Sequence, residues 1–97
     1  MEHELKTWPD FFNPVLTGET NFELRYDDRG FHAGDILRLR EWDRKNGYTG
    51  REIRLVVTYL LCGFPWLTKG YVAMATKPVI TLESALTSSA EGKDGAP

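Results

Sequence analysis

A carboxylate and a guanidinium lie two residues apart in the segment that begins at Gly18 and ends at Arg25. This segment is typical of a turn that leads into a strand, and successive side chains of a strand point to opposite faces. Glu23 and Arg25 are therefore expected to share one face with Asn21. The other face is expected to be buried and carries Phe22, Leu24 and Tyr26. An acidic and a basic group placed in this way either contact a common ligand or neutralise each other as an ion pair.

The groups around this pair suit the chemistry of a nucleotide. Lys6 and Arg25 are candidates to contact a phosphate or the acceptor edge of a base, and an arginine can donate two parallel hydrogen bonds. Glu23 can accept a hydrogen bond from a base amino group, and an indole ring can stack on the base. In the alternative interpretation, Glu23 and Arg25 form an internal ion pair that orients the turn at 27–29. The candidate ligand-binding residues are Lys6, Trp8, Thr20, Glu23, Arg25, Arg29 and Trp42.

A second group of basic residues follows two predicted strands that are joined by a hairpin. They either form an outer face that binds a phosphate chain, with an affinity that falls steeply with salt, or are neutralised by neighbouring carboxylates. The net charge of −2 gives the whole molecule no attraction for nucleic acid. The basic residues are Arg38, Arg40, Arg44, Lys45, Arg51 and Arg54, and the carboxylates are Glu41, Asp43 and Glu52.

The composition sets loose bounds on function. A chain of 97 residues is long enough for one domain with a single core. Cys62 is the only cysteine, and its apolar neighbours predict a buried, inert thiol. His3 and His32 are far apart in sequence, so no metal or cofactor is expected. The charged first residues lack the apolar run of a signal peptide, and no stretch approaches the roughly 20 apolar residues that span a bilayer, so a cytoplasmic location is expected.

The order of turn signals and apolar residues predicts a mostly β (α+β) fold, a small and partly open β-barrel of five to six strands. A helix is expected between Trp8 and Gly18, and Pro14 is expected to break it, because an internal proline costs about 3 kcal/mol. The Asn46-Gly47 pair predicts a hairpin. Strands are expected at 3–7, 21–26, 35–42, 51–61 and 71–77.

Two further segments lie outside this pattern. Phe64 and Trp66, in the loop that follows the longest strand, are expected either to cover one end of the core or to form a lid. The domain is expected to span residues 1–83. Residues 84–97 are rich in serine, alanine and glycine and are expected to form a disordered tail, because they offer too little apolar surface to offset the entropy of ordering.

Several motifs resemble those of the ASCH domain, a branch of the PUA-like β-barrels. They are Gly18-x-x-x-x-Glu23-x-Arg25 and, further along, Gly34-Asp35-Ile36-Leu37. With His3-Glu4-Leu5-Lys6, Glu41-Trp42 and Tyr48-Thr49-Gly50-Arg51, they are most similar to a small ASCH-related family of bacteria and phages. The resemblance implies a pseudo-barrel with a short N-terminal helical insertion, and a cleft beside the Glu23 strand that binds RNA or a nucleotide-like ligand.

The resemblance also bears on enzymatic activity. Some ASCH proteins hydrolyse acetylated cytidine with a lysine, a threonine and a glutamate, but the lysine position is Thr20 here and the threonine position is Glu23. A threonine does not replace an activated amine without a neighbouring base, so this activity does not carry over. The expected function is an RNA- or nucleotide-binding module. The alternatives are a hydrolase of a modified nucleoside or RNA, and a phage or mobile-element accessory protein that binds a host protein.

Overall fold

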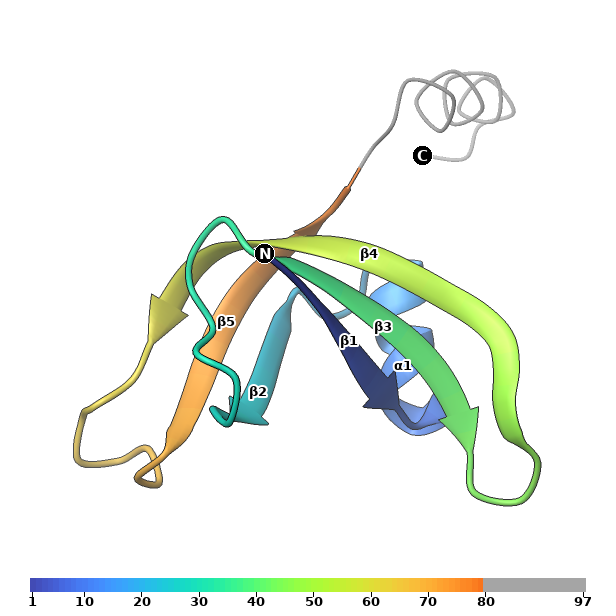
Figure 1. Cartoon of the computed structure of the whole chain (residues 1–97), viewed down its shortest axis with the longest axis horizontal. Coiled ribbons are helices and arrows are strands. Elements are labelled where there is room, and N and C mark those ends of the chain that lie inside the picture. Colours follow the sequence, from blue (N-terminus) through green and yellow to red (C-terminus); the bar gives the residue numbers. More distant parts are fainter. Residues whose placement is uncertain (80–97) are drawn as a thin grey trace.

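The computed structural model describes residues 1–79, which form five strands and one helix (Figure 1). The strands form one mixed sheet in the order β1-β3-β4-β5-β2, in which β1 runs parallel to β3 and the other pairs are antiparallel. The sheet curls into a half-barrel, so the mostly β prediction is confirmed. The elements are β1 (Glu2–Thr7), α1 (Pro9–Thr17), β2 (Phe22–Tyr26), β3 (Ile36–Asp43), β4 (Gly47–Leu61) and β5 (Tyr71–Pro78).

The core lies on the concave side of the sheet, where α1 packs beneath the arch of β3 and β4 (Figure 1). Every second residue of the strands points to this side, as the pleat of a strand requires. Phe12 and Val15 of α1 fill the space between the strands. The buried apolar residues are Leu5, Phe12, Val15, Phe31, Leu37, Leu39, Leu55, Val57, Val72 and Met74.

The predicted break of the helix at Pro14 is wrong, because α1 continues through it to Thr17. Pro9 occupies the first turn, where a missing N–H costs nothing, and Gly18 ends the helix in the left-handed conformation with φ 86°. Burial of Phe12 and Val15 stabilises the helix by about 1.5–3 kcal/mol per side chain. This gain is large enough to offset the proline.

The predicted orientation of β2 is also wrong. Phe22, Leu24 and Tyr26 are 60%, 55% and 58% exposed, whereas Glu23 is only 7% exposed. The cause is the pairing with β5, which places Glu23 opposite buried Met74. The polar residues of β2 therefore face the concave side, and its apolar residues face outward.

Of the remaining expectations, one is confirmed and two are wrong. The hairpin is confirmed, since Asp43 of β3 pairs with Gly47 of β4 around the predicted turn. Cys62 is exposed rather than buried, and Trp66 is 84% exposed, so it does not cover the core. The predicted domain end at residue 83 and the disorder expected of residues 84–97 lie outside the described residues.

Candidate functional site

A pocket of about 560 Å³ lies between α1 and β2, beside the end of β1. Its walls are mainly apolar, with a few polar groups from β1 and β2, a composition typical of small-molecule sites of this size. The lining residues are Lys6, Thr7, Trp8, Phe11, Pro14, Val15, Thr20, Phe22, Glu23, Leu24 and Arg25.

The pocket runs along the free edge of β2. Four consecutive residues of this strand, 22–25, line it, although alternate residues of a strand point to opposite faces. Only a space beside the strand edge contacts both sets of side chains. β2 pairs with β5 on one side alone, so its other edge borders the pocket.

Glu23 and Arg25 form an ion pair at this pocket. The Nε of Arg25 donates a hydrogen bond of 3.0 Å to Oε1 of Glu23. The same guanidinium donates to the hydroxyl of Thr7 at 3.1 Å and to the carbonyl of Lys6 at 3.3 Å. The pair is therefore internal, as the alternative interpretation predicted, but Arg25 contacts β1 rather than the turn at 27–29, and the pair also borders an open cavity.

Burial raises the pKa of the Glu23 carboxyl, although the charge and the hydrogen bond of Arg25 act in the opposite direction. A carboxyl in this position is easier to protonate than one in water. When ionised it is a hydrogen-bond acceptor only, and when protonated it also donates. The wall of the pocket therefore includes a buried carboxyl that accepts hydrogen bonds and, once protonated, also donates one.

The other candidate residues are divided between the pocket and its surroundings. Trp8 and Thr20 line the pocket, and Arg44 lies over the Trp8 ring at 4.1 Å. Lys6 borders the pocket, but its ammonium lies 4.3 Å from the centre of the Trp42 ring. Trp42 does not line the pocket, and the structure therefore brings Trp8, Thr20, Glu23 and Arg25 together but separates them from Trp42.

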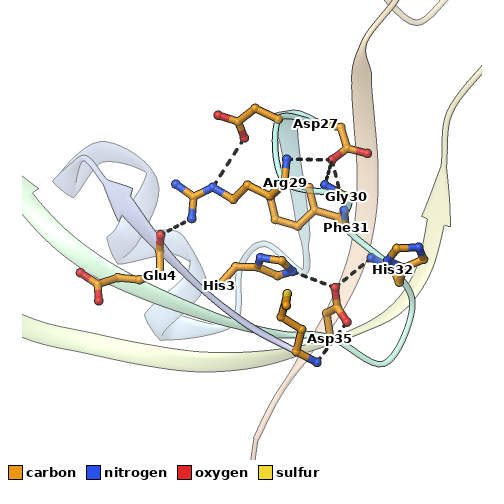
Figure 2. A network of polar contacts seen from close by, with 10 residues as sticks. His3, Glu4, Asp27, Arg29, Gly30, Phe31, His32 and Asp35 are labelled. Carbon is orange, nitrogen blue, oxygen red and sulfur yellow. Dashed lines mark hydrogen bonds and ion pairs between the residues drawn. The ribbon is translucent and has the colours of Figure 1, made fainter.

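Arg29 belongs to a second polar network (Figure 2). Its guanidinium donates to the carbonyl of Glu4 in β1 at 2.6 Å, and the loop around it is held by Asp27, which accepts from the N–H of Gly30 at 2.7 Å. Arg29 therefore belongs to the loop between β2 and β3, which it attaches to β1, and it lies outside the pocket.

The second network continues to a buried pair. His3 and Asp35 lie 2.8 Å apart, and Asp35 also accepts from the N–H of His32 and from the terminal amine of Met1 (Figure 2). The hydrogen bond from His3 lowers the pKa of Asp35 below its ordinary value. These contacts fix the loop before β3 against the start of β1, which is a structural role.

Most of the basic residues on the predicted hairpin are paired with carboxylates. On the convex side, Arg38 pairs with Glu52 at 2.8 Å, and both Arg40 and Arg54 pair with glutamates of β1. Arg51 pairs with Glu41 at 2.8 Å on the concave side. The balanced alternative is thus confirmed for these four arginines, with Glu2 and Glu4 as partners that sequence reasoning missed.

The sequence reasoning also missed apolar residues of the pocket, chiefly Phe11, Phe22 and Leu24. Phe22 and Leu24 were assigned to the core. Phe11 precedes buried Phe12, and adjacent residues of a helix do not share one narrow face, so the Phe-Phe pair was a usable signal. In residues 1–79 no cluster of three metal-ligating side chains occurs, and no helix is long and apolar enough to cross a membrane.

Comparisons with known proteins place this domain in a family. Residues 2–76 match the model of a family described as a domain of unknown function, DUF3850. The chain is also 35% identical over 65 residues to the "Uncharacterized 12.9 kDa protein in GpA 3'region" of Escherichia phage P2. That alignment covers 67% of this chain and 59% of the relative, so the chain spans less than two thirds of the phage protein. Because the family match covers residues 2–76, well over half of the chain, the chain belongs to the DUF3850 family.

Proposed function

We propose that the pocket between α1 and β2 binds a nucleobase, as part of an RNA or of a nucleotide-like ligand. The observation that carries the proposal is the Glu23 carboxyl, buried and paired with Arg25, beside an open apolar cavity. A nucleobase has apolar faces and a polar rim, and this pocket offers apolar walls and a small polar group in the same arrangement. We also propose that the DUF3850 half-barrel is related to the ASCH and PUA-like domains, whose motifs it resembles.

The walls supply the contacts for the faces of the base. Phe11 and Phe22 border the pocket and are 62% and 60% exposed, so their rings are accessible to a ligand. Stacking of a base on an aromatic ring contributes about 1–3 kcal/mol. The Trp8 ring is already covered by Arg44 at 4.1 Å, whereas its contact with Phe11, at 6.3 Å between ring centres, leaves the Phe11 side chain 62% exposed.

The charges outside the pocket indicate that the base, rather than the phosphate chain, dominates the affinity. Arg38, Arg40 and Arg54 are neutralised by carboxylates, and the net charge is −2. Binding that depends on phosphate contacts weakens steeply with salt, because counterions are released. We therefore expect binding to depend only weakly on salt.

The proposal is tested by titration with nucleosides, nucleoside monophosphates and a short single-stranded RNA. Fluorescence of Trp8 reports on the pocket once Trp42 and Trp66 are replaced by Phe. We expect Glu23→Gln to change the affinity for at least one base about tenfold, which is the effect of about 1.4 kcal/mol. Glu52→Gln, on the convex side, is the matched control and is expected to leave the affinity unchanged.

Two outcomes would change the conclusion. If no compound of the panel binds at millimolar concentration, the nucleobase proposal is wrong. The panel includes N4-acetylcytidine, because a buried carboxyl with a raised pKa is also suited to general acid–base chemistry. Release of acetate that is lost in Glu23→Gln would replace simple binding by hydrolysis as the function.

A further inference from the structure

We propose that the main chain of β2 forms hydrogen bonds with the polar rim of the base, through the carbonyl of Phe22 and the N–H of Leu24. This inference rests on the proposed function, because it concerns the same pocket. It adds the chemical class of the ligand: a planar ring system that offers a hydrogen-bond donor beside an acceptor.

The register of the sheet determines which main-chain groups of β2 face the pocket. The N–H of Thr76 donates to the carbonyl of Asn21 at 2.9 Å, and the N–H of Asp27 donates to the carbonyl of Gly70 at 2.8 Å. In an antiparallel ladder, residues with main-chain groups directed to the partner alternate with residues whose groups are directed away. Asn21 and Asp27 are the first and last of the odd-numbered residues, whose main-chain groups point to β5. The even-numbered residues between them therefore direct their N–H and carbonyl groups to the free edge.

These groups have no protein partner within the described residues, apart from the carbonyl of Tyr26, which accepts from the N–H of Asp28 at 3.0 Å. The free edge of β1, across the pocket, is different. Its carbonyls at Glu4 and Lys6 accept hydrogen bonds from Arg29 and Arg25. One edge is therefore capped by guanidinium groups, while the other remains available at the pocket.

The wall formed by α1 offers a ligand no polar side chain, so the main-chain groups of β2 are the hydrogen-bonding side of the pocket. Phe11, Pro14 and Val15 of α1 offer only apolar side chains. A planar ligand gains most when its polar rim lies along β2 and its apolar surface contacts α1, because a polar group left unpaired in such a site loses its hydrogen bonds to water without replacement. The buried carboxyl of Glu23, on the same stretch of strand, adds a third polar group.

The chemical class follows from the order of donor and acceptor along the edge. The carbonyl of Phe22 accepts, and the N–H of Leu24 donates. An amino group beside a ring nitrogen, as in adenine and cytosine, matches this pair, and so does an imide N–H beside a carbonyl, as in uracil. Methylation of the ring nitrogen removes the match in each case.

The decisive variant is Leu24→Pro. Proline removes the N–H that faces the pocket, while the ladder with β5 is preserved because this N–H takes no part in it. We expect about a tenfold loss of affinity for the nucleoside that binds best. Tyr26→Pro is the matched control, since it removes an N–H from the same edge outside the pocket, and its affinity should stay within about threefold of the unmodified protein. Leu24→Ala retains the N–H and should lose less affinity than Leu24→Pro.

A measurement on the ligand tests the inference independently of how well the proline variant folds. N1-methyladenosine or N3-methylcytidine should bind the unmodified protein about tenfold more weakly than the parent nucleoside, whereas removal of the ribose 2′-hydroxyl should have little effect. Equal loss in Leu24→Pro and Leu24→Ala, or full affinity for the methylated bases, would overturn the main-chain contact and leave the pocket's function intact. Binding of an extended peptide along this edge, with no nucleoside bound, would overturn both proposals.

Discussion

Glu41 offers the sharpest test of how the concave side of the sheet is stabilised. Its carboxylate accepts two hydrogen bonds of 2.8 Å from Arg51 and one of 2.7 Å from Thr49, and the residue is only 4% exposed. Arg51 also donates to the side-chain oxygen of Asn13 at 2.7 Å, so the cluster joins the β3–β4 hairpin to α1. Replacement of Glu41 by Gln removes the charge and weakens its hydrogen bonds with Arg51 and Thr49.

The expected magnitude follows from the pKa of Glu41. Hydrogen bonds from Arg51 and Thr49 lower this pKa from 4.5 to about 2, against the opposing effect of burial. At about 1.36 kcal/mol per pH unit, this difference corresponds to at most about 3.4 kcal/mol of folding stability. Because the Arg51 side chain is 48% exposed, solvent screens the interaction, and we expect Glu41→Gln to cost about 1–2 kcal/mol at pH 7.

The sign of the pH dependence is fixed by the direction of the shift. A carboxyl with a lowered pKa in the folded state contributes stability that is complete above pH 4.5 and is lost as the pH falls toward 2. The difference between the unmodified protein and Glu41→Gln, measured by urea unfolding at pH 7, 5 and 3, should therefore shrink at pH 3. Glu52→Gln, in the more exposed pair with Arg38, should cost clearly less stability than Glu41→Gln at pH 7. Equal losses in the two variants, or a difference that does not depend on pH, would refute this reasoning.

Two further predictions concern β2 and its neighbours. Arg25→Ala should lower the free energy of unfolding by about 2–4 kcal/mol, because it leaves the Glu23 carboxyl buried without its partner. Leu24→Ala, at an exposed site, should lower it by less than about 1 kcal/mol. The opposite order of the two losses in urea unfolding would mean that β2 faces the other way. Gly70→Ala should cost more than Gly50→Ala in thermal unfolding. Both glycines have positive φ, but only at position 70 would the added Cβ lie 2.7 Å from the ring of Tyr26, and equal losses would show that this ring moves aside freely.

The sequence allowed the strands to be predicted, because turn residues and β-branched runs act locally. The Asn46-Gly47 turn and the long strand rich in valine, isoleucine and threonine depend on neighbouring residues only, and the structure confirms both. The helix was placed correctly, but its continuity through Pro14 depends on the burial of Phe12 and Val15 against distant strands. Rules that consider only neighbouring residues do not include the stability gained from such long-range burial.

The orientation of β2 shows why the site was predicted only in part. Alternation indicates that Glu23 and Arg25 share a face, and this is confirmed. It does not indicate which face is covered, because that depends on the register with β5 and on the contact of Arg25 with Thr7 and Lys6, about 18 residues earlier. Alternation alone therefore predicts that Phe22 and Leu24 belong to the core, whereas in the structure they border the pocket.

The arginine contacts between the two edge strands have a consequence for access to the interior. Where a closed barrel would join β1 to β2 by a main-chain ladder, here the side chain of Arg25 joins β2 to β1, and the side chain of Arg29 joins the loop after β2 to β1. Long side chains rearrange far faster than strands separate, and their rotation disturbs no ladder hydrogen bond. We therefore expect these side chains to open and close the gap between the edges while the rest of the sheet keeps its pairing, which would give access to the interior without unfolding.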